Sequence, residues 1–87
     1  MYVSPLAGAI LKGDENEFLD LLTVHDINER DKSGLTPLHH CLFNKKEELA
    51  MQCLGLQCDI NAKDKRGNTP LHVAALRASI TITQAIL

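Results

Sequence analysis

The chain has 87 residues, 45 % apolar and 23 % charged, which fits one small globular domain and excludes a disordered chain. No apolar run approaches the roughly 18–20 residues that span a bilayer, and residues 1–10 lack the basic start of a secretory signal, so we expect no membrane insertion. The formal net charge of −2, the pI near 6.0 and the 3 % of aromatic residues argue against nucleic-acid binding.

A segment of nine residues occurs twice, with an offset of 33 residues. Residues 31–39 read Asp-Lys-Ser-Gly-Leu-Thr-Pro-Leu-His and residues 64–72 read Asp-Lys-Arg-Gly-Asn-Thr-Pro-Leu-His. Each copy predicts a turn, because its glycine can adopt positive φ, followed by a helix with threonine as N-cap and proline in the first turn. The residues with these structural roles are Gly34, Thr36, Pro37, Leu38, His39, Gly67, Thr69, Pro70, Leu71 and His72.

The repeated Thr-Pro-Leu-His and the 33-residue period resemble the ankyrin repeat, whose signature is Thr-Pro-Leu-His-x-Ala in the same period. The resemblance implies an all-α repeat solenoid, in which helix-turn-helix units stack and β-hairpin-like loops, or fingers, connect them. We expect His39 and His72 to hydrogen-bond within their own turn and to the neighbouring repeat. We therefore predict a structural role for both histidines, and no role in ligand binding or catalysis.

The first predicted element is a degenerate N-terminal capping repeat at residues 1–30, with helices near 4–12 and 15–24. Pro5-Leu6-Ala7 stands where the resemblance places Pro-Leu-His, so Ala7 replaces the histidine of the motif. Loss of motif residues is expected in a terminal repeat, because one of its sides faces solvent.

A full repeat at residues 31–63 and a truncated repeat at residues 64–87 complete the predicted organisation. A finger near 27–36 leads to helices near 37–44 and 47–55, and a finger near 60–69 leads to helices near 70–77 and 80–87. The chain stops before the apolar last helix is covered, and such a surface favours aggregation. We expect that the natural chain continues past Leu87, or that another molecule covers this end.

Three cysteines are an odd number without a Cys-x-x-Cys pair, which argues against a disulfide framework. This usage favours a reducing intracellular compartment. We expect the cytoplasm rather than the nucleus. His39, His40 and Cys41 cannot converge on one metal ion, because neighbours on a helix point about 100° apart. We expect Cys41, Cys53 and Cys58 to be small buried apolar residues, and we predict no metal or other cofactor.

No combination of residues predicts catalysis. The sequence lacks a Gly-rich phosphate loop, Gly-x-Ser-x-Gly and His-Glu-x-x-His. A Cys–His nucleophile would need an orienting group and an oxyanion donor around a pocket, and the spacing suggests neither. The acidic residues at 14–17 begin a helix, where the helix dipole favours carboxylates. We predict that the chain is not an enzyme and has no small-molecule substrate.

The resemblance also implies a concave surface for a protein partner, built from the finger tips and the exposed face of each first helix. Carried over by position, this surface combines basic groups with two apolar groups at equivalent places, and we expect a partner with acidic residues around an apolar anchor. Phe43 and Arg77 are the expected energetic centres. The predicted partner-binding residues are Lys32, Ser33, Leu35, Phe43, Asn44, Lys65, Arg66, Asn68, Leu76 and Arg77.

The predicted function is therefore a non-catalytic adaptor or scaffold, which mediates protein–protein interaction. The charge distribution is compatible with this function: residues 1–31 hold two basic and seven acidic residues, and residues 32–87 hold seven basic and four acidic residues. The resulting charges of −5 and +3 can steer a partner to one end, or can simply belong to two solvated faces. The alternative is a structural segment of a longer chain or complex, with its open C-terminal face permanently covered.

Overall fold

The computed structural model describes residues 5–76, which form five α-helices and no strand within this range. The helices are α1 (Pro5–Lys12), α2 (Glu15–Leu21), α3 (Pro37–Phe43), α4 (Glu47–Gly55) and α5 (Pro70–Leu76). The predicted all-α solenoid is confirmed. The fingers are tight turns without strand pairing in the described part of the chain, so they are hairpin-like only in outline.

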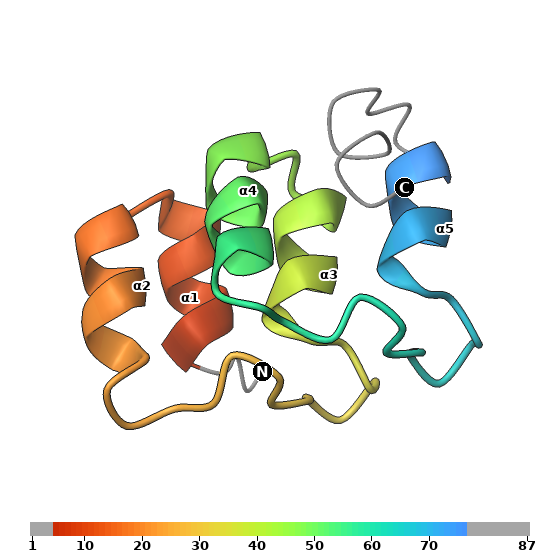
Figure 1. The fold of residues 1–87 in the computed structure, drawn as a ribbon, viewed down its shortest axis with the longest axis horizontal. Helices are drawn as coiled ribbons and strands as arrows, with labels where there is room; N and C mark the ends of the chain where they lie inside the picture. Colours follow the sequence, from red (N-terminus) through yellow and green to blue (C-terminus); the bar gives the residue numbers. More distant parts are fainter. Residues whose placement is uncertain (1–4, 77–87) are drawn as a thin grey trace.

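The helices are arranged in two layers (Figure 1). Helices α1, α3 and α5 pack in sequence as the inner row, while α2 packs on α1 and α4 packs on α3 as the outer row. The segments that connect one helix pair to the next run across the ends of the inner helices, at the bottom of the view in Figure 1. This arrangement places the two fingers side by side.

The core lies between the two layers and along the inner row. Ile10 of α1, Phe18 of α2 and Cys53 of α4 are completely buried, as is Val73 of α5. These side chains belong to one continuous cluster, so every described helix contributes to the same core. The core is built mainly from aliphatic residues, and Phe18 is its only aromatic member among the fully buried residues of 5–76.

The start of α3 follows the predicted capping chemistry. The Thr36 hydroxyl accepts from the His39 backbone N–H, and the His39 ring accepts in return from the Thr36 backbone N–H. Pro37 occupies the first turn, where the missing N–H of proline costs no intrahelical hydrogen bond. At α2 the N-cap is Asp14, whose carboxylate accepts from the Glu17 N–H.

Each finger turns on the repeated Asp-x-x-Gly segment. Gly34 and Gly67 adopt φ values of 77° and 83°, as the sequence predicts. The backbone N–H of each glycine donates to the carbonyl of the aspartate three residues before it, at 3.0 Å in the first finger and 2.9 Å in the second. Asp31 and Asp64 therefore begin equivalent turns.

Four hydrogen bonds join the first finger and the start of α3 to the second finger. The Lys65 N–H donates to the Ser33 carbonyl at 3.0 Å, and the Arg30 guanidinium donates to the Lys63 carbonyl at 2.8 Å. The other two bonds run from the Asp59 N–H to the side chain of Asn28 and from the His39 ring to the Asn68 carbonyl. These bonds fix one finger relative to the next.

The predicted helix near 15–24 is too long, because α2 ends at Leu21. Beyond this point the Thr23 and Val24 N–H groups donate three residues back, to Asp20 and Leu21, and the Thr23 hydroxyl also bonds to the Asp20 carbonyl. This tighter bonding ends the α-helix. Over the described residues, the other helices agree with the predicted ranges to within one residue. Residue 4 of the first predicted helix, residue 77 of the fifth, and the whole predicted helix near 80–87 lie outside the described residues.

Candidate functional site

A groove with a volume of ≈ 540 Å³ lies between the fingers and the inner helices. It brings together eight of the ten residues predicted from the sequence to contact a partner. Asn44 does not line the groove, because its side-chain amide donates to the His40 carbonyl and closes the end of α3. Arg77 lies outside the described residues. The groove is lined by Lys32, Ser33, Leu35, His40, Phe43, Asp64, Lys65, Arg66, Asn68 and Leu76.

The apolar part of the groove comes from both repeats. Phe43, the last residue of α3, is half-buried against the core, and Leu35 is half-buried in the first finger. Leu76 is the last described residue of α5, at the position equivalent to Phe43, and is 72 % exposed. An exposed leucine beside a half-buried phenylalanine gives the groove apolar surface that a partner can cover.

The basic part of the groove lies on the finger tips. Lys32, Lys65 and Arg66 are exposed, and none of the ion pairs among residues 5–76 uses their side chains. The bond from the Lys65 N–H to the Ser33 carbonyl holds the two tips together, so the three cations lie along one rim. These cations are available to pair with anionic groups of a ligand.

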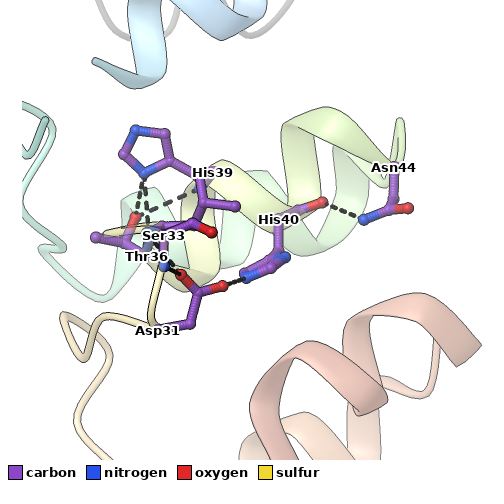
Figure 2. A network of polar contacts seen from close by, with 7 residues as sticks. Asp31, Ser33, Thr36, His39, His40 and Asn44 are labelled. Carbon is purple, nitrogen blue, oxygen red and sulfur yellow. Dashed lines mark hydrogen bonds and ion pairs between the residues drawn. The ribbon is translucent and has the colours of Figure 1, made fainter. Parts of the chain in front are cut away.

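Two carboxylates of the fingers are held by hydrogen bonds within the protein. The Asp31 Oδ1 atom accepts from the Ser33 and Leu35 N–H groups at 2.9 and 3.0 Å, while Oδ2 lies 2.8 Å from the His40 ring (Figure 2). Burial alone would raise the pKa of Asp31, but the hydrogen bonds from Leu35, His40 and Ser33 outweigh it and lower that pKa. Asp31 is therefore a fixed anion behind the rim of the groove.

Asp64 has the equivalent role in the second finger. Its Oδ1 atom accepts from the Asn68 and Arg66 N–H groups, each at 2.9 Å. The bond from the Asn68 N–H is the largest of the effects that lower the pKa of Asp64, and it acts against a smaller effect of burial. Among residues 5–76 no histidine hydrogen-bonds to Asp64, because Val73 stands where the repeat offset would place the equivalent of His40.

The sequence prediction missed His40 and Asp64 as groove residues. His40 precedes Phe43 by three residues, and residues three apart share one face of a helix, so this spacing was a usable signal. Asp64 has the same position in its finger as Asp31, and each aspartate starts a copy of the nine-residue repeat. Both side chains line the groove because the fingers fold back against the inner helices.

His39 makes the bond between repeats that the sequence predicts. Its Nε2 atom lies 2.9 Å from the Asn68 carbonyl, which can only accept, so Nε2 carries the hydrogen. Nδ1 accepts from the Thr36 N–H at 3.2 Å and lies 2.8 Å from the Thr36 hydroxyl. These bonds select the neutral ring and give His39 a structural role.

His72 repeats only the local part of this network, since its ring bonds to Thr69 within the same turn. Its side chain is exposed, whereas that of His39 is completely buried. Among the other motif residues, Pro37, Leu38 and Pro70 are buried and Leu71 is half-buried.

Two of the three cysteines are buried, as the sequence predicts, and Cys58 is only half-buried. The Cys41 and Cys53 sulfurs lie 4.0 Å apart, and this contact, followed by burial, raises the pKa of Cys53. Burial raises the pKa of Cys58 to about 11. Within residues 5–76 no cluster of three or more His, Cys, Asp or Glu side chains could hold a metal ion.

The helix pairs stack with a sequence offset of 33 residues, and hydrogen bonds join their fingers. This architecture is that of a helical repeat protein. The family model for ankyrin repeats, in three copies, matches residues 6–87, and the chain belongs to the ankyrin-repeat family. Ankyrin repeats are generally protein–protein interaction modules, and the family is typically non-catalytic. No match was found among curated proteins. None of the helices described in residues 5–76 is long and apolar enough to cross a membrane.

Proposed function

We propose that the chain is a non-catalytic adaptor or scaffold module, which binds a protein partner through the groove between its fingers and inner helices. The observation that carries this proposal is the composition of the groove. Three exposed cations without an acidic partner among residues 5–76 surround an apolar surface from two repeats.

The partner that fits this groove carries acidic residues around an apolar anchor. Carboxylates of the partner would pair with Lys32, Lys65 and Arg66, and an apolar side chain would cover Phe43 and Leu76. Interfaces concentrate their energy in a few aromatic and arginine residues, so Phe43 is the expected centre of the contact. Arg77 follows Leu76 directly and remains part of the proposed surface.

The cysteines support a location for this interaction. Cys41 and Cys53 are buried as free thiols, and burial raises the pKa of the half-buried Cys58 thiol to about 11. Free cysteines persist in reducing compartments, which include both the cytoplasm and the nucleus. Of the two, we propose the cytoplasm.

Affinity capture with the full chain as bait tests the proposal. The groove variant is K65E/R66E, and the matched control is K45E/K63E, which changes the net charge equally at exposed lysines that do not line the groove. Proteins captured by the parent chain should bind the groove variant at least about tenfold more weakly, a loss of about 1.4 kcal/mol, and should bind the control within about twofold.

Circular dichroism should first show that the groove variant and the control retain the helix content of the parent. Equal capture by the parent and K65E/R66E would contradict the groove assignment. Binding would then use another surface, and the structural-segment alternative would be favoured.

A further inference from the structure

The Asp31–His40 pair places a titratable group in the wall of the groove. The His40 Nε2 atom lies 2.8 Å from Asp31 Oδ2, and the two side chains are 20 % and 24 % exposed. Figure 2 shows the contact between Asp31 and His40. His40 lines the groove together with Phe43, which lies about one turn further along α3. Histidine is the side chain whose ordinary charge change falls between about pH 5 and pH 8.

The hydrogen bonds of this pair define where a proton enters. The Asp31 carboxylate can only accept, so His40 donates from Nε2 in both charge states of the ring. Nδ1 has no hydrogen-bond partner among the described residues, and no side-chain nitrogen or oxygen in this part of the chain is both buried and unpartnered. Nδ1 therefore reaches solvent, and it takes up the proton without breaking the bond to Asp31.

Protonation of His40 changes the charge of the groove by a large fraction. The lining holds three permanent cations and one carboxylate, and Asp31 lies directly behind it. The formal charge of this set is +1 with a neutral His40 and +2 with a charged one. The other charged or titratable groups on the helices packed against α3 lie outside the groove lining. They are Lys12 on α1, Glu47, Glu48 and the buried thiol of Cys53 on α4, and His72 on α5.

We propose that the Asp31–His40 pair makes the affinity for an acidic protein segment depend on pH, with tighter binding at lower pH. This inference rests on the proposed function. The protonated ring adds a cation beside the rim, while the ionised Asp31 keeps the ring in place. This pH-sensitive pair occurs in one repeat, because buried Val73 occupies the position equivalent to His40 in the next repeat.

The test begins with random peptides displayed on phage and selected on the immobilised full chain. The proposed function predicts acidic peptides with an apolar anchor, which no longer bind K65E/R66E. A selected peptide, synthesised with a fluorophore, is then titrated with the chain at about pH 7.5 and about pH 5.5, where the carboxylates of the peptide remain ionised. We expect the dissociation constant to fall about threefold to tenfold at the lower pH.

Two variants assign the effect to His40. H40V copies the residue of the next repeat, and H40Q keeps an N–H donor for Asp31 but takes up no proton in this range. Both should bind the peptide with the same affinity at the two pH values. The control H25Q removes the other histidine–carboxylate pair, His25 with Glu29 at 3.2 Å, and should keep the full pH effect.

The outcomes separate the two proposals. A pH effect that persists in H40V and H40Q, or that is absent from the parent chain, overturns the proton-dependent groove and leaves the proposed function intact. Selected peptides that are not acidic, that bind K65E/R66E unchanged, or that cannot be obtained contradict the groove as a site for acidic segments, and the inference fails with it.

Discussion

The buried His39 gives a quantitative test of how the two finger turns are joined. Its ring bonds to the N–H and hydroxyl of Thr36 within one repeat and to the Asn68 carbonyl of the next. His72 has the same bonds to its own threonine, but its side chain is exposed and lacks the bond between repeats within residues 5–76. Replacing each histidine by leucine therefore compares two chemically equal changes in different surroundings.

The cost of H39L follows from the groups that lose a partner. The Thr36 N–H is left buried and unsatisfied, since Thr36 is only 2 % exposed, and such a group costs about 1–3 kcal/mol. The Asn68 carbonyl keeps the bond from the Asp64 N–H, so losing the His39 bond costs about 0.5–1.5 kcal/mol. The expected loss is about 2–4 kcal/mol, against a total of about 4–13 kcal/mol for a chain of this size.

Urea denaturation followed by circular dichroism measures this loss. H39L should lower the free energy of unfolding by about 2–4 kcal/mol and the thermal midpoint by at least about 10 °C. H72L should cost less than about 1 kcal/mol, because water replaces the lost bonds at an exposed site. Equal losses in the two variants would refute the reasoning, since the bond between repeats would then contribute nothing beyond the local turn.

Two further predictions use the finger turns. G34A should destabilise the chain by about 1–3 kcal/mol more than G67A in the same denaturation assay. Both glycines have positive φ, but of the two only Gly34 has backbone close to an added Cβ, with the Lys65 nitrogen at 3.0 Å. Equal losses in the two variants would contradict this reasoning. The pKa values of Asp31 and Asp64 are lowered from 3.8, so the folded chain binds fewer protons than the unfolded chain as acid is added. Stability is then fully present above about pH 5 and falls as the pH drops through the lowered pKa values. D31N/D64N should show a shallower fall in the urea midpoint between about pH 5 and about pH 3, and an unchanged slope would exclude these two carboxylates as its cause.

The repeated segment explains why most of the fold was predictable. Glycine after Asp-x-x fixes the turn, and Thr-Pro fixes the first residue of the helix, so α3 and α5 begin at Pro37 and Pro70 as predicted. These signals are local and act within four or five residues of each other. The end of α2 carried no such signal, because residues 22–33 contain neither glycine nor proline. The tight turn at Thr23 includes a hydrogen bond from the Thr23 side-chain hydroxyl to the Asp20 carbonyl.

The basic and apolar residues of the groove could be predicted from the sequence, whereas His40 and Asp64 were missed. Lys32 and Lys65 occupy equivalent finger positions, and a comparison of the repeats finds both. The same comparison conceals His40, because its equivalent is Val73 and the position therefore looks variable. Its pairing with Asp31 depends on the finger folding back on α3, which is a tertiary contact between residues nine positions apart.

The same bonds that stabilise the stack also position the groove. The rim cations extend from fingers that are joined by backbone and buried side-chain bonds, so their backbone positions are set before a partner arrives. Binding then costs mainly the side-chain freedom of lysine and arginine, and little backbone ordering. Neither Gly34 nor His39 lines the groove, yet we expect G34A and H39L to loosen the second finger relative to the first. Both changes should therefore weaken partner binding as well as stability, whereas H72L and G67A, which leave the bonds between the fingers intact, should affect binding less.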